Sequence, residues 1–72
     1  MTLFDLKPGE EGKVAMIGCK GALKRRIMDM GVTPGTTIKV IKIAPLGDPI
    51  EVNIRGYELS LRKEEAKQIN LQ

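Results

Sequence analysis

The sequence of 72 residues has no histidine, no tryptophan and a single cysteine, and Phe4 and Tyr57 are its only aromatic residues. A catalytic triad built on histidine and a zinc site that contains histidine are therefore excluded, and two aromatics are too few for a platform that stacks nucleic-acid bases. Cys19 alone cannot close an intrachain disulfide, which suits a reducing compartment. Because these residue types are absent or scarce, most enzyme classes are excluded, and we expect a protein without catalytic activity.

Long apolar runs are also missing. No uncharged stretch approaches the roughly 18 residues of a membrane span, and Asp5 and Lys7 interrupt the region where the apolar part of a secretory signal would lie. Hydrophobic residues make up 42% of the chain and charged residues 29%, a balance typical of a globular protein. We therefore expect residues 1–72 to form a single small domain, located in the cytoplasm.

Hydrophobic periodicity predicts five short strands and one inserted helix. Leu23, Ile27 and Met30 recur at the spacing of one helical face, which predicts a helix over residues 22–30. Runs of β-forming residues or alternating apolar residues predict the strands, over 12–17, 36–43, 50–54 and 57–61 and around residues 69–71, with a helical turn over 62–66. Because such short strands would leave exposed edges in a flat sheet, we expect a mainly β fold, a small five-stranded SH3-like barrel with a short inserted α-helix.

Residues 50–61 read as a hairpin that turns at Gly56. We place Gly56 first in a type II′ turn, because a type I′ turn would force a positive φ on Arg55. In the resulting register apolar residues face apolar residues and charges face opposite charges, in the pairs Ile54–Leu59, Val52–Leu61, Arg55–Glu58 and Glu51–Arg62. The same periodicity assigns to the core Leu23, Ile27, Ile38, Val40, Ile50, Val52, Ile54, Leu59 and Leu61.

Three separate stretches resemble the FeoA family. The first is Leu6-Lys7-Pro8-Gly9-Glu10 with Gly12, and the second contains Leu23, Arg26, Ile27, Met30, Gly31, Pro34 and Gly35. The third and most specific runs from Ala44-Pro45-Leu46-Gly47-Asp48-Pro49-Ile50 through Val52, Gly56 and Leu59 to Leu61-Arg62-Lys63, Glu65-Ala66 and Ile69. Together they cover nearly the whole chain, so coincidence explains them far less well than it would a lone motif.

The resemblance implies a small cytoplasmic accessory protein of bacterial ferrous iron uptake that docks on a FeoB-type membrane GTPase transporter and modulates it. It implies contact with the membrane only through that partner. From the residues we expect no cofactor, no small-molecule substrate and no nucleic acid. A related domain occurs in iron- and manganese-dependent repressors. The alternative function is therefore that of a metal-responsive or nucleic-acid-binding small SH3-like barrel.

The candidate partner-binding residues are Lys24, Arg25, Met28 and Leu46. With Lys20 and Arg26, the first two give one end of the predicted helix four positive charges, and Met28 lies off the apolar stripe. Leu46 lies between two prolines that stiffen its loop, which would lower the entropy lost on binding. The alternatives are that the charges only solvate the helix, and that the loop is a plain connection with Leu46 folded onto the barrel.

No residue is assigned to catalysis, to a cofactor or to a metal. The sequence contains no glycine-rich loop of the kind that cradles nucleotide phosphates, so GTP hydrolysis would belong to a partner. The thiol of Cys19 lies beside Lys20, but with no second cysteine nearby we interpret it as an inert small residue. Ferrous ion in proteins commonly binds carboxylate together with imidazole, and the imidazole is missing, so we expect no tight metal site.

Overall fold

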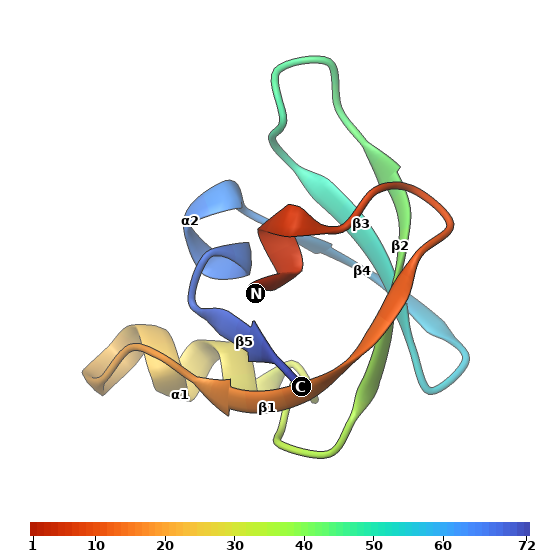
Figure 1. Cartoon of the computed structure of the whole chain (residues 1–72). Coiled ribbons are helices and arrows are strands. Elements are labelled where there is room, and N and C mark those ends of the chain that lie inside the picture. The colour runs from red at the N-terminus through yellow and green to blue at the C-terminus, as the bar shows by residue number, and fades with distance from the viewer.

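The computed structural model describes residues 1–72, and its five antiparallel strands curl around one core (Figure 1). In chain order the elements are η1 (Leu3–Asp5), β1 (Glu11–Ile17), α1 (Gly21–Asp29), β2 (Thr37–Ile43), β3 (Ile50–Ile54), β4 (Tyr57–Leu61), α2 (Lys63–Ala66) and β5 (Ile69–Leu71). The strand order in the sheet is β4-β3-β2-β1-β5. The mainly β fold with a short inserted helix is thereby confirmed. Neither α-helix is long and apolar enough to cross a bilayer.

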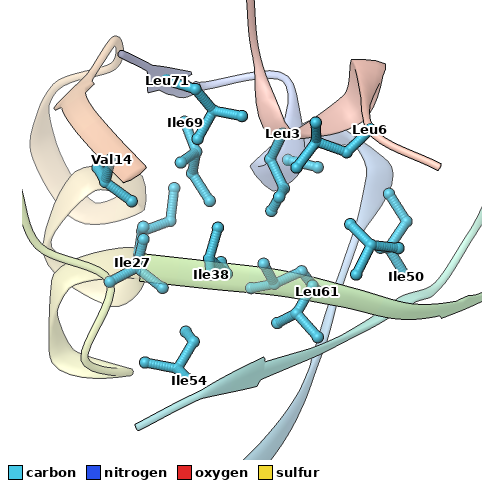
Figure 2. Packing of buried hydrophobic residues seen from close by; sticks show 14 of the residues in the cluster. Leu3, Leu6, Val14, Ile27, Ile38, Ile50, Ile54, Leu61, Ile69 and Leu71 are labelled. Atoms are coloured by element: carbon cyan, nitrogen blue, oxygen red, sulfur yellow. The ribbon is translucent and has the colours of Figure 1, made fainter. Parts of the chain in front are cut away.

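The core is a cluster of 15 buried hydrophobic residues contributed by the sheet, both helices and η1 (Figure 2). Ile27 is the one residue of α1 that is fully buried, and it meets side chains from β2 and β3 in the same space (Figure 2). Seven of the nine residues assigned to the core are buried, whereas Leu23 and Leu59 are only partly buried. Leu23 lies in the first turn of α1 and Leu59 on a strand at the edge of the sheet, so solvent reaches one side of each.

The first residues of the chain pair with the last strand to complete the barrel, a contact that sequence periodicity did not indicate. The amide of Leu71 donates a hydrogen bond to the carbonyl oxygen of Met1 at 2.8 Å, and Thr2 pairs with Asn70. These contacts cover the outer edge of β5. The core also contains buried apolar residues that periodicity did not assign to it: Leu3, Leu6, Val14, Ile17, Val32, Ala66, Ile69 and Leu71. The ends of the chain therefore belong to the core.

The turn of the β3–β4 hairpin differs from the prediction. Ile54 pairs with Tyr57, so the two central residues of the turn are Arg55 and Gly56, with φ angles of 51° and 88°. This is the type I′ arrangement, in which both central residues have a positive φ. For a residue other than glycine that conformation costs roughly 1–2 kcal/mol. The prediction of a type II′ turn that begins at Gly56 is therefore wrong.

The register of the same hairpin is shifted by two residues as a consequence. Neither predicted ion pair forms, since Glu51 faces Ser60 and Glu58 faces Asn53. A shift of two keeps every side chain on its own face, so burial of the apolar face could not distinguish the two registers. The observed register sets Ile50 opposite Leu61, whereas the predicted one would set Ile50 opposite a residue of α2.

Candidate functional site

Helix α1 presents a separate face to solvent. Ile27 is buried and Leu23 and Met30 pack against the core, while the side chains opposite them line a shallow open depression. That depression is formed by five residues, which we call the α1 outer face: Gly21, Lys24, Arg25, Met28 and Asp29. Their spacing of three and four positions is that of one side of an α-helix. Three of the four predicted partner-binding residues therefore share one surface.

The net charge of the chain is concentrated at this helix. Residues 20–29 contain four basic side chains and one acidic side chain, whereas the other 62 residues contain eight of each. The formal net charge of +3 is therefore carried by α1 and the residue before it. Lys24 and Arg25 are exposed and take part in no ion pair or side-chain hydrogen bond within the chain. The surface is suited to an acidic partner.

Arg26 differs from the other basic residues of α1, because it contacts α2. Its Nε lies 3.3 Å from Oε2 of Glu65, as an ion pair without hydrogen-bond geometry. The Glu65 side chain is 4% exposed, and its Oε1 accepts a hydrogen bond from the amide of Arg62 at 2.8 Å. Arg26 therefore compensates a buried carboxylate and holds α1 against α2. We did not single out Glu65 from the sequence. The signal is its place at the third position of a helix, where a glutamate side chain commonly accepts a hydrogen bond from the backbone amide of the residue that caps the helix.

The C-terminal end of α1 is fixed to the β3–β4 hairpin. The hydroxyl of Tyr57 donates a hydrogen bond to the carbonyl oxygen of Met30 at 3.2 Å. Gly31 follows with a φ of 95°, and a Cβ atom there would lie 2.6 Å from the Tyr57 hydroxyl oxygen. Glycine is thus required at position 31 both for the backbone conformation and for the close approach of Tyr57.

Leu46 lies apart from the α1 outer face, on the loop between β2 and β3 that extends from the opposite end of the molecule (Figure 1). Its side chain is 89% exposed, so it is not folded onto the barrel. The loop is nevertheless braced. Gly47 donates a backbone hydrogen bond to Ala44 at 2.7 Å, and Asp48 accepts one from the amide of Lys63 at 3.0 Å. The loop therefore presents an apolar side chain on a defined backbone.

The remaining candidate groups are dispersed. Cys19 is half-buried and packs against the core. Nowhere do three cysteine, aspartate or glutamate side chains gather around a point that could hold a metal ion. The absence of a tight metal site stays a prediction that titration must test. What the side chains do form is a charged surface suited to binding.

Comparison with known proteins identifies the family. Residues 1–72 match the FeoA domain along the whole chain. The chain belongs to the FeoA family. The FeoA-like protein from Clostridium acetobutylicum is 43% identical, with a TM-score of 0.92 over 100% of this chain and 84% of that one. The FeoA of Stenotrophomonas maltophilia, solved with zinc and described as a prokaryotic SH3 domain protein, is 25% identical, with a TM-score of 0.86 over 100% and 89% of the two chains. The SH3-like fold is thereby confirmed.

One FeoA relative is joined to a transporter. A protein of Porphyromonas gingivalis described as a fusion of Fe(2+) transport protein A and Fe(2+) transporter FeoB is 36% identical over all 72 residues. The chain spans 8% of the length of that relative. The similarity thus covers the FeoA portion of a much longer polypeptide.

Proposed function

We propose that this FeoA chain is a non-enzymatic accessory protein that docks on a FeoB-type membrane GTPase transporter and modulates it. The observation that supports this partner is the fusion protein of Porphyromonas gingivalis, in which a sequence similar to the whole chain shares a polypeptide with the transporter. Joining two binding partners by a linker raises their effective concentration to the millimolar range. A fusion of this kind keeps two domains that act together close to each other.

The docking face in this proposal is the α1 outer face. Lys24 and Arg25 supply positive charge and form no ion pair, although Asp29 lies on the same face, and Met28, 36% exposed, supplies an adaptable apolar contact one turn further along the helix. Such a surface recognises an acidic patch that has an apolar centre. Complementary charge raises the association rate at low salt and loses this effect as salt screens it.

Leu46 is the proposed second contact. An exposed leucine on a braced loop loses little conformational entropy when it enters an apolar pocket, because hydrogen bonds already restrict the loop backbone. The loop and α1 lie at opposite ends of the molecule (Figure 1). One flat patch on a partner could not cover both, so the two contacts would engage different parts of the transporter.

The experiment is a binding titration of the full chain against the detergent-solubilised FeoB-type transporter of the same organism, at about 50 and 300 mM salt. The variant Lys24→Glu/Arg25→Glu reverses the charge of the α1 outer face. The matched control Lys7→Glu/Lys13→Glu makes the same change of net charge at two exposed residues of β1 and the preceding turn. Circular dichroism verifies that both variants are folded.

We expect the reversal in α1 to slow association at least about tenfold at low salt and to flatten the salt dependence, with a much smaller effect in the control. Equal effects of the two variants would mean that only overall charge matters and would remove the docking site from α1. Failure of the parent chain to bind the transporter under any condition would refute the proposed function itself.

A further inference from the structure

The tip of the β3–β4 hairpin carries a backbone conformation that its sequence disfavours. Arg55 is the one residue other than glycine with a positive φ, at 51°. The first central position of a type I′ turn strongly prefers asparagine, aspartate or glycine, and any of these would relieve the conformation. An arginine is held there against local preference.

The arginine gains nothing within the chain that would compensate for this conformation. Arg55 is exposed, and its guanidinium makes no hydrogen bond and no ion pair. Glu58, which the sequence suggested as its partner, faces Asn53 instead. Strain of this kind, in a place where the fold does not use the side chain, points to a role outside the fold.

Arg55 lies close in the chain to the residue that contacts the end of α1. It lies two residues before Tyr57, whose hydroxyl bonds to the carbonyl of Met30 at the end of α1. At 1.5 Å per residue, Lys24 and Met30 are only about 9 Å apart along the helix axis. Tyr57, which is half-exposed, therefore fastens the start of β4 to the C-terminal end of α1, two residues along the chain from the free arginine.

We propose that Arg55 is a specificity-determining contact of the docking surface, whose planar guanidinium binds a carboxylate of the partner through two parallel N–H···O bonds. Arginine has this geometry and lysine does not, and arginine is, with tryptophan and tyrosine, among the residue types enriched where binding energy concentrates. The turn holds the backbone of Arg55 in one conformation, so less conformational entropy is lost when its side chain binds a partner. This inference rests on the proposed docking through α1 and deepens it.

The test compares Arg55→Asn, Arg55→Lys and the control Lys13→Asn, each titrated against the same detergent-solubilised FeoB-type transporter and each melted by circular dichroism. Asparagine relieves the backbone, so Arg55→Asn should melt a few degrees higher than the parent. It should nevertheless bind at least about tenfold more weakly. Arg55→Lys keeps the charge but not the paired bonds and should also bind more weakly, by several-fold. Lys13→Asn removes one charge elsewhere and should bind like the parent.

A gain in stability together with a loss of binding would support the proposal, because a purely structural turn residue would not produce both. Parent-like binding of Arg55→Asn would overturn it, and so would a loss no larger than that of Lys13→Asn. If the Lys24/Arg25 reversal abolishes binding while Arg55→Asn does not change it, docking through α1 stands and the role of Arg55 falls. If the parent does not bind, both fall together.

Discussion

Replacing Arg26 with alanine should destabilise the folded chain, because it leaves the buried carboxylate of Glu65 without its ion-pair partner. The Glu65 carboxylate is buried, and its Oε2 has no hydrogen-bond partner, so Arg26 supplies its only compensating charge. Removing one member of a fully buried pair costs about 3–5 kcal/mol, and removing one member of an exposed pair costs at most about 1 kcal/mol. Because the Arg26 side chain is 60% exposed, we expect about 1–2 kcal/mol.

That loss is measurable in a chain of this size. For a domain of 60–100 residues each kcal/mol shifts the melting temperature by about 4–8 °C, so Arg26→Ala should melt roughly 4–16 °C lower than the parent. The control is Arg25→Ala, on the same helix but without a partner in the chain, which should stay within about 0.5 kcal/mol. Urea denaturation followed by circular dichroism gives both values.

Glu65→Gln completes the cycle. Glutamine keeps the oxygen that caps α2 and removes the buried charge, so Arg26→Ala should cost little in that background. The reasoning is refuted if Arg26→Ala is no more destabilising than Arg25→Ala. It is also refuted if the cost of Arg26→Ala is unchanged by Glu65→Gln, because then the loss would come from packing of the arginine and not from its charge.

Four further outcomes follow from the described contacts. Ile27→Ala should lose about 2–5 kcal/mol in urea denaturation, more than Leu23→Ala, because Ile27 is fully buried and Leu23 only partly. Gly31→Ala should lower the melting temperature, since it places a Cβ 2.6 Å from the Tyr57 hydroxyl at a φ of 95°, and normal stability would contradict that geometry. Leu46→Ser should leave stability within about 0.5 kcal/mol while weakening binding to the transporter; binding equal to the parent would remove the loop from the interface. Isothermal titration of the isolated chain with ferrous ion should detect no one-to-one binding with a Kd below about 1 μM. Binding that tight would disprove the expectation that the carboxylates form no tight metal site.

The elements of the fold could be predicted because their signals are local. The period of Leu23, Ile27 and Met30 is that of a helix, and the alternation through Ile50 and Val52 is that of a strand half buried against a core. The same local patterns placed Lys24, Arg25 and Met28 off the apolar stripe, and in the structure all three are exposed on one side of α1. Side chains of one helix keep a fixed angular relation whatever surrounds the helix.

Other features depend on groups that are distant in sequence and could not be predicted in this way. The burial of Glu65 needs Arg26, which lies 39 positions earlier, and no period in the chain signals that pair. The predicted and the observed registers of the β3–β4 hairpin differ by two residues and bury the same faces, so the hydrophobic pattern could not distinguish them. The positive φ of Arg55 belongs to the observed register.

The sequence by itself determined which residues form strands and helix, which side of each is apolar, and that the chain lacks the groups for most catalysis, because these follow from residue type and spacing. Only the tertiary structure decided which charges are neutralised and which stay free. It assigns Arg26 to a buried carboxylate, leaves Lys24, Arg25 and Arg55 unpaired, and brings Tyr57 of the hairpin to the end of α1. The physical reason is that pairing and strain depend on distances between segments, and those exist only once the barrel has closed.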